Sequence, residues 1–243
     1  MFLRSVPFLV CASSGLLFAP AARAQTSLRL GPRVGLNLAT YHFDESAKVA
    51  VKYRPGLEAG VAGVVRRGAF ALHVAALYSQ KGLTNRYSID IRDSNNTIVD
   101  VGDGQSRSRL HYVVLPLSLA YGLGPDGRGP HVFAGPYLGV LLGGNYQSTV
   151  VHRVSGATYT SEGRIRPVND EAPDLAAYTR RVDAGVQAGV GYQHGALLLQ
   201  AAYSLGLRNG APKFFFNGVP VTTNAYYNRV VQGSLTYLFG PQN

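Results

Sequence analysis

The sequence predicts an all-β protein: an eight-stranded antiparallel up-and-down transmembrane β-barrel with short periplasmic turns and long extracellular loops. Three observations lead to this fold class. Large apolar residues alternate with small or polar ones in eight segments, the small face carries almost no charge, and the connections are alternately short and long. Soluble barrels turn their bulky face inward and cover the other with charged residues, whereas membrane barrels reverse this arrangement.

Residues 182–206 show the alternation most clearly. A helix is excluded because five glycines (185, 189, 191, 195 and 206) would each cost about 1 kcal/mol relative to alanine. As a strand, the first half places Val186, Val190 and Tyr192 on one face and Gln187 with glycines on the other. The segment therefore reads as a hairpin with an apolar outer face and a small inner face.

The same alternation recurs along the chain. The eight predicted strands cover 28–41, 53–66, 70–82, 110–122, 131–143, 181–192, 196–207 and 228–239. Short turns are predicted at 66–69, 122–130 and 193–196, and long loops at 42–52, 83–109, 144–180 and 208–227. Loop lengths sorted in this way are typical of outer-membrane barrels.

Each predicted strand has an outward and an inward face. Leu72, Leu117, Leu138 and Leu199 are expected to face lipid. The inward set is Arg33, Asn37, Glu58, His73, Tyr112, Ser118, Tyr137, Gln187 and Gln200. Two aromatic girdles are expected, with Tyr41, Tyr53 and Tyr78 toward the long loops and Phe70, Tyr121, Tyr192, Tyr237 and Phe239 toward the turns. Pro32, Pro116 and Pro136 fall within strands, so we expect bulges or bends there.

The first 24 residues read as a cleaved secretory signal: Arg4, an apolar run and Ala22-Arg23-Ala24 before Gln25. The barrel then comprises 25–243, and Cys11, the only cysteine, is lost with the signal. Removing Arg4 and Arg23 lowers the formal net charge from +10 to +8. The sequence has no basic run with interleaved aromatic residues of the kind that binds nucleic acid. Contact with anionic outer-membrane lipid and lipopolysaccharide is therefore the simpler expectation.

Five stretches resemble the PorT-type outer-membrane β-barrel family. They are YSQKG (78–82), LHYVVLPLSLAY (110–121), FAGPYLGVLL (133–142), LLLQAAYSLGLRN (197–209) and NRVVQGSLTYLFG (228–240). The resemblance implies an eight-stranded barrel in the outer membrane of a Gram-negative bacterium, with a link to secretion. Val114, Ala120 and Ala202 stand where the family often has charged residues, which puts a function of interior charges in doubt.

The last strand also resembles the terminal signal that the barrel-assembly machinery reads during insertion. That signal comprises Gly233, Leu235, Tyr237 and Phe239. An ordinary final strand would share this alternation.

The sequence offers few candidates for catalytic or metal-binding residues. We expect no catalytic residues. None of the histidines (42, 73, 111, 131, 152 and 194) sits in a motif with a nucleophile. Ser79 is too far along the strand from His73 to act with it, although a serine on a neighbouring strand could approach His73. Neither Asp100 and Asp103 nor the group of Asp170, Glu171 and Asp174 matches a calcium loop, so no metal and no cofactor is expected. Phe214, Phe215 and Phe216 form a candidate loop patch that covers the barrel mouth, dips into lipid or docks a partner.

The function predicted from the sequence is a non-enzymatic outer-membrane barrel with a structural or partner-docking role in the cell envelope. The unknown partner would be an envelope protein, and the barrel is expected to be a monomer. Eight strands leave an interior that side chains fill, so negligible conductance is expected. The alternatives are a small-solute or lipid-binding transport barrel, a lipid-modifying barrel enzyme and a soluble lipocalin-like carrier.

Overall fold

The computed structural model describes residues 26–43, 50–174, 176–216, 219–221 and 224–240. Among them, regular structure consists of β-strands and one 3-10 turn, so the all-β prediction is confirmed. The predicted signal at 1–24 lies outside the described residues. None of the described helices has the length and apolar character needed to cross a membrane.

Eight long strands carry the architecture. They are β1 (Ser27–Phe43), β2 (Ala50–Arg67), β3 (Phe70–Arg92), β4 (Ile98–Gly122), β5 (Gly129–His152), β8 (Val182–His194), β9 (Leu197–Gly206) and β12 (Tyr226–Tyr237). The short elements are η1 (Pro125–Gly127), β6 (Thr158–Val168), β7 (Tyr178–Arg180), β10 (Phe214–Phe216) and β11 (Val219–Val221).

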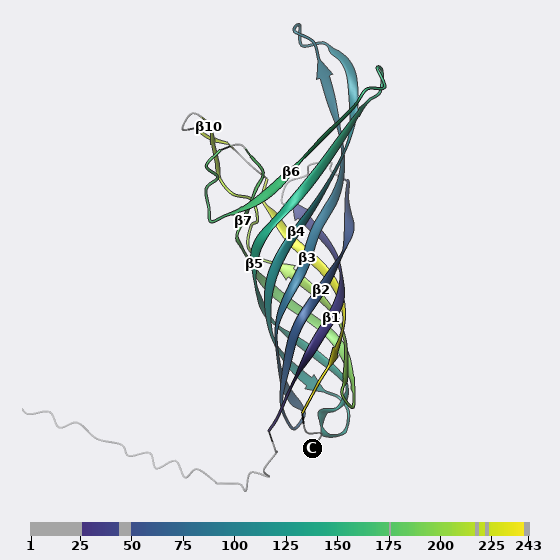
Figure 1. Cartoon of the computed structure of the whole chain (residues 1–243), viewed down its shortest axis with the longest axis vertical. Coiled ribbons are helices and arrows are strands. Elements are labelled where there is room, and N and C mark those ends of the chain that lie inside the picture. The colour runs from purple at the N-terminus through teal and green to yellow at the C-terminus, as the bar shows by residue number, and fades with distance from the viewer. Residues whose placement is uncertain (1–25, 44–49, 175, 217–218, 222–223, 241–243) are drawn as a thin grey trace, which may run out of the picture.

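The long strands pair in a closed circuit. Each is antiparallel to its neighbours in the order β1, β2, β3, β4, β5, β8, β9, β12 and back to β1. Figure 1 shows them tilted around a common axis. β6 adds to the distal part of β5, β7 runs parallel to β6, and β10 with β11 forms a separate hairpin. A circuit of this kind leaves none of the eight strands with an open edge along its paired part.

The two faces of the circuit are the reverse of a soluble barrel. Large apolar side chains point away from the axis: Leu36 is 65% exposed, Leu117 44% and Leu199 57%. All nine residues predicted to face inward are buried. The inside-out pattern predicted from the sequence is therefore confirmed.

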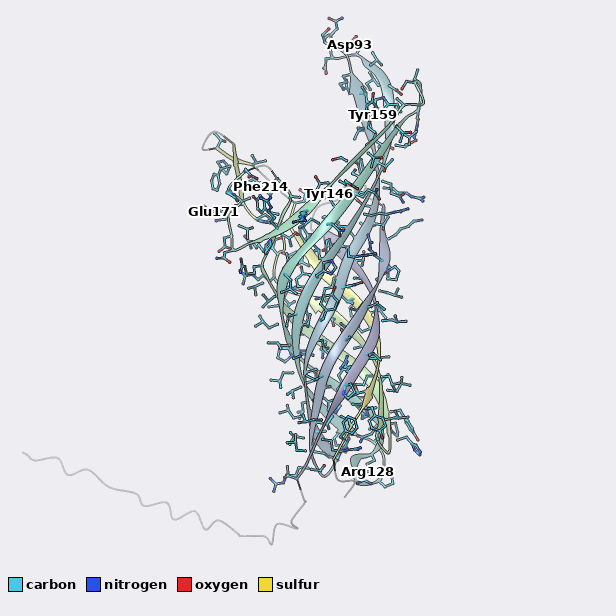
Figure 2. All side chains as sticks on the ribbon, in the orientation of Figure 1. Asp93, Arg128, Tyr146, Tyr159, Glu171 and Phe214 are labelled. Atoms are coloured by element: carbon cyan, nitrogen blue, oxygen red, sulfur yellow. The ribbon has the colours of Figure 1, made fainter. Side chains whose placement is uncertain are left out.

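The short turns lie where the alternation stops. Gly68 (φ +60°) closes the β2–β3 turn and Gly195 (φ +56°) the β8–β9 turn, in a left-handed conformation that costs glycine little. η1 fills the β4–β5 connection. All three turns lie at the end of the circuit near Arg128 (Figure 2).

The opposite end departs from the prediction. The segments 83–109 and 144–180, expected as loops, are largely strand, because β3 and β4 pair from Leu83 out to Arg92 and Ile98 and β5 pairs with β6. Figure 1 shows these hairpins rising well beyond the circuit. Alternation there is confined to short runs such as Tyr87, Ile89 and Ile91, and most of these residues are exposed or half-buried, so the extended periodicity on which the prediction rested is lacking.

The prolines interrupt strands less than expected. Pro32 pairs opposite Val61 in an unbroken register. Near Pro116 and Pro136 the ladder skips pairs and resumes without a shift, and the register shifts lie elsewhere, between Tyr53 and Glu58, at His111/Tyr112 and at Ile91/Arg92. Of the expected bulges or bends, no bulge lies at these three prolines, and the bends stay a prediction; the skipped pairs near Pro116 and Pro136 agree with the absent N–H group.

The aromatic residues near the turns match the prediction. Phe70 packs on Tyr121 and Tyr237 on Phe239, with ring centroids 5.2 and 5.0 Å apart, and all four are exposed. At the other end Tyr53 and Tyr78 also face outward. Tyr41 does not: it is buried and stacks on Tyr226 at 4.7 Å. Its assignment to the outer girdle is wrong because β1 is paired through this level and turns Tyr41 toward the axis.

Candidate functional site

A buried ion pair lies on the barrel axis, toward the end of the circuit that carries the long hairpins. Lys81 Nζ on β3 lies 2.8 Å from Asp183 Oδ2 on β8, and the Tyr137 hydroxyl on β5 donates to the same carboxylate at 3.3 Å. The ammonium also lies 5.0 Å from the Tyr112 ring centroid and 4.8 Å from that of Tyr137. Four strands thus meet at one charge pair, whose desolvation is offset by hydrogen bonding and by the aromatic faces.

A second polar layer lies nearer the short turns. Arg33 forms an ion pair with Glu58 at 3.2 Å and donates to Gln200 at 3.2 Å, and Gln200 in turn lies 3.1 Å from His73 Nδ1. The hollow beside these groups holds about 20 Å³. That volume suits about one water molecule, so the interior at this level is filled by side chains.

The sequence reasoning found part of this interior. Val114, Ala120 and Ala202 are buried, as the resemblance implied, yet charge pairs are present at other positions. Lys81 was missed because it lies near the end of its predicted strand. The signal that could have identified it is its place on the same face of β3 as His73 and Ser79.

An apolar cluster closes the interior toward the long hairpins. It comprises Tyr41, Leu83, Leu110, Tyr112, Val114, Tyr137, Leu141 and Ile165, with Ala177 and Tyr226 packed against it. Together with the two polar layers, the cluster fills the axis of the circuit with side chains. The expected lack of conductance stays a prediction.

The histidine and serine candidates in the interior have hydrogen-bond partners among amide side chains. His73 lies directly across from Ser118, but the Ser118 hydroxyl accepts a hydrogen bond from Gln187 at 2.9 Å. Ser79 accepts from Asn37 at 2.8 Å. The hydrogen bonds of both serines therefore join them to amide side chains, and both hydroxyls are buried.

Asp100 and Asp103, two of the acidic residues considered for metal binding, lie against basic side chains. Asp103 accepts two hydrogen bonds of 2.8 Å from Arg153, and Asp100 lies 3.2 Å from His152. The Arg153 guanidinium holds the pKa of the Asp103 carboxyl below its usual range. These pairs join β4 to the β5–β6 turn and so connect the two projecting hairpins. Within the described ranges, no group of three or more metal-binding side chains comes together.

The region beyond the circuit carries the exposed features that a partner could reach. We call the distal parts of β3, β4, β5 and β6 the arm: residues 83–109 and 144–168. Figure 2 shows Asp93 and Tyr159 at its far end and Tyr146 nearer the circuit. Val154 is 78% exposed, Tyr159 62% and Val99 51%.

An arginine-rich hollow of about 550 Å³ lies at the base of the arm. Its lining residues are Arg54, Arg107, Arg109, Asn145, Tyr146, Gln147, Glu162, Gly163 and Arg164. Four arginines face one carboxylate there, and the sequence analysis did not single them out. The available signal was RSR at 107–109, two arginines at strand spacing.

The phenylalanine patch lies beside the mouth. Phe214 and Phe215 belong to β10, and Phe215 is 42% exposed. Backbone hydrogen bonds from Ala172 to Lys213 and from Lys213 to Asp170 fasten the base of this hairpin to the 170s loop. Figure 1 shows the hairpin displaced to one side of the circuit, so the fold over the mouth is not observed. Phe216 lies on β10, opposite Val219.

The residues of the predicted assembly signal lie at the end of β12 and, for Phe239, two residues beyond it. Leu235, Tyr237 and Phe239 point outward and are exposed, and a side chain at Gly233 would meet open space. Phe239 exchanges two backbone hydrogen bonds with Leu30 of β1. The closing seam between the first and last strands therefore extends to the predicted signal, whose recognition stays a prediction.

Comparison with known proteins gives a family match. A model described as "Outer membrane protein beta-barrel domain" matches residues 23–210. A search of curated proteins finds no match to this sequence.

Several solved structures are similar. Neisserial surface protein A (NspA) is 12% identical, with 86% of this chain and 97% of that one covered and a TM-score of 0.42. OmpT of Escherichia coli, an outer membrane protease, is 10% identical over 88% of this chain and 96% of that one, with a TM-score of 0.38. Ail, the attachment invasion locus protein of Yersinia pestis, is 9% identical over 87% and 98%, with a TM-score of 0.36.

Proposed function

The chain belongs to the outer membrane protein beta-barrel domain family, and from this we propose that it is a non-enzymatic barrel that docks a partner protein outside the outer membrane. The closed circuit anchors the protein in the bilayer, and the arm presents the docking surface. The finer features proposed with it are an eight-stranded transmembrane barrel, a cleaved signal at 1–24, a PorT-type relationship and a monomeric state.

The circuit has the dimensions and polarity of a spanning barrel. Outward residues on β4 are apolar from Val113 to Tyr121, about 26 Å along the strand and about 20 Å along the normal at a tilt of 35–45°. The inward residues include two polar layers, each built around a buried ion pair. These properties support an eight-stranded barrel whose turns lie in the periplasm and whose arm lies outside the cell.

The observation that carries the docking proposal is apolar exposure where no lipid can cover it. Val99, Val154 and Tyr159 lie on the outer part of the arm, and Phe215, Val219 and Val221 on the adjacent hairpin are also exposed. Exposed apolar groups outside a membrane are typical of protein interaction sites. The ion pairs between the two hairpins hold this surface in one shape, which lowers the entropy cost of binding.

A transport barrel is the second function considered. It would need a passage or a ligand cavity on the axis, and the interior hollow of about 20 Å³ is too small for a solute. A lipid-modifying enzyme would need a paired nucleophile and base, and the contacts of Ser79 and Ser118 count against it. The docking role is therefore the function that the geometry supports best.

Insertion would depend on the barrel-assembly machinery, which we propose reads Gly233, Leu235, Tyr237 and Phe239 at the end of β12. Lipid and lipopolysaccharide surround the apolar outer face. No cofactor is part of the proposal.

Single-cysteine crosslinking in intact cells tests the docking role. The only native cysteine, Cys11, lies in the predicted signal, so Val154→Cys and Tyr159→Cys each place one thiol on the arm. A matched control, Leu123→Cys, places a thiol on an exposed residue of a short turn. We expect a thiol-specific crosslinker to capture the same partner from both arm positions and not from the control. Capture of nothing from the arm, or of the same species from all three, would contradict the proposal.

A further inference from the structure

The arginines at the base of the arm have no ion-pair partner among the described residues. Arg54 donates to the Ser108 carbonyl at 3.2 Å and Arg107 to Gln105 at 3.2 Å, while the seven salt bridges of the described chain use other cations. Glu162 is the one acid that lines the hollow. A hollow with four guanidinium groups and one carboxylate has an excess of three positive charges, which anionic groups would neutralise.

Three of these arginines, Arg107, Arg109 and Arg164, lie on the outward face of the sheet that β4, β5 and β6 form. Positions 107 and 109 continue the outward set 113–121 of β4, because the extra residue at the nearby register shift lies on β5. Arg164 pairs with Asn145, which pairs with Arg109, so its side chain lies on the same face. The hollow is therefore accessible from the side of the barrel that contacts lipid.

These arginines lie at the height expected for the lipid headgroups. Arg109 lies 12 residues from Tyr121 of the opposite girdle, about 40 Å along the strand and about 30 Å along the normal at a tilt of 35–45°. The apolar band of such barrels is about 25 Å tall, so Arg109 lies a few ångströms beyond it. Tyr78 of β3, which pairs with Val113 and stacks on His111 at 5.9 Å, marks the outer edge of the band, and Arg109 lies four residues beyond Val113 on β4.

We propose that this hollow binds the phosphate groups of a phosphorylated glycolipid of the outer leaflet. Guanidinium groups suit this role because their planar forks match phosphate oxygens, and Asn145 and Gln147 beside them can hydrogen-bond sugar hydroxyls. The inference rests on the proposed membrane anchoring and names the lipid that the anchor prefers. The lateral opening and the headgroup height favour a lipid over a soluble polyanion, which would approach from the end of the arm.

The test uses purified full-length protein in detergent, with bisphosphorylated lipid A and its dephosphorylated form as probes. The variant Arg107→Gln/Arg109→Gln removes two charges from the hollow. The matched control Arg67→Gln/Arg128→Gln removes two exposed arginines from the short turns at the other end. We expect the first variant to bind bisphosphorylated lipid A about 30-fold more weakly and the control to bind it as the parent does.

A third variant distinguishes loss of the binding site from loss of folding, because it is expected to increase the affinity. Glu162→Gln removes the one carboxylate of the hollow and should tighten binding of bisphosphorylated lipid A. The proposal is overturned if the dephosphorylated lipid binds equally well, if the control loses as much affinity as the hollow variant, or if Glu162→Gln has no effect. It is also overturned if a soluble sulfated oligosaccharide fills the hollow and lipid A does not compete. Failure here leaves the docking role intact, since crosslinking at Val154 and Tyr159 reports on the far end of the arm.

Discussion

The circuit and the arm share three strands, β3, β4 and β5, yet they obey different rules. Within the circuit the outward face is apolar and the inward face polar, because lipid lies on one side and a water-poor axis on the other. Within the arm both faces mix charged, polar and apolar residues, because water reaches both. Pairing between β3 and β4 continues in register from one environment into the other, and β4 and β5 pair in both despite one register shift at His111/Tyr112. Backbone hydrogen bonding alone therefore does not decide where the membrane ends.

The comparison also separates two sources of stability. The circuit is held by buried charge pairs on its axis and by a ladder that closes on itself. The arm relies on exposed pairs such as Arg153 with Asp103 and on cross-strand contacts. We therefore expect substitutions on the axis to affect the whole protein and substitutions in the arm to act locally.

The largest effect is expected from the axial charge pair. Lys81→Met removes the partner of Asp183 and leaves a buried carboxylate, which should lower the free energy of unfolding by about 3–5 kcal/mol. Urea unfolding in lipid vesicles, followed by tyrosine fluorescence because the chain has no tryptophan, measures the change.

The double variant Lys81→Met/Asp183→Leu serves as its control. Replacing both charges removes the unpaired carboxylate, so most of the lost stability should return. If the double variant were as unstable as the single one, the pair would owe its importance to packing rather than to charge.

The next effect concerns the lipid-facing surface. Leu117→Arg places a charge near the middle of the apolar band and should cost about 2–4 kcal/mol. Val99→Arg makes the same change at an exposed residue of the arm, where a surface substitution should stay within about 0.5 kcal/mol. Equal costs in vesicles would erase the distinction between circuit and arm.

The circuit and the arm also differ in how well their structure could be predicted from the sequence. Most of the circuit was predictable, because a lipid face next to a filled interior imposes a period of two along each of its strands. The arm was not, since its alternating runs are short and mixed with charged residues. Tyr41 was misplaced for a related reason, because periodicity places the last residue of a strand less firmly than its middle.

Sites were harder to predict than strands. The Lys81–Asp183 pair joins residues 102 apart in the chain, and no local pattern indicates which interior groups will meet. The arginine hollow likewise draws Arg54, Arg109 and Arg164 from three strands. Both depend on strand register, which the sequence alone did not provide.

A smaller, local effect is expected where glycine lies beneath an aromatic ring in the arm. Gly104 is opposite Tyr87, and a Cβ there would lie 2.3 Å from the ring. Gly104→Val should displace Tyr87, break its 2.8 Å hydrogen bond to Ser148 and destabilise the arm by about 1–3 kcal/mol. Hydrogen exchange should rise in 83–109 and stay unchanged in β8 and β9, whereas a rise across the circuit would show that the arm and the circuit unfold together.

The smallest effect is a change with pH at the tip of the arm. The two hydrogen bonds from Arg153 lower the pKa of Asp103 in the folded protein, so their contribution is present above the ordinary aspartate pKa of about 3.9 and is lost as the pH falls through the lowered value. Carboxyl carbon shifts of Asp103 measured by NMR should therefore titrate below the ordinary value, and Arg153→Gln should move the midpoint upward. Because the pair is exposed, the circuit should show no change over this pH range. If Arg153→Gln left the titration midpoint of Asp103 unchanged, the two hairpins would not be joined through this pair. The rigid shape assumed for the docking surface would then have to come from strand pairing alone.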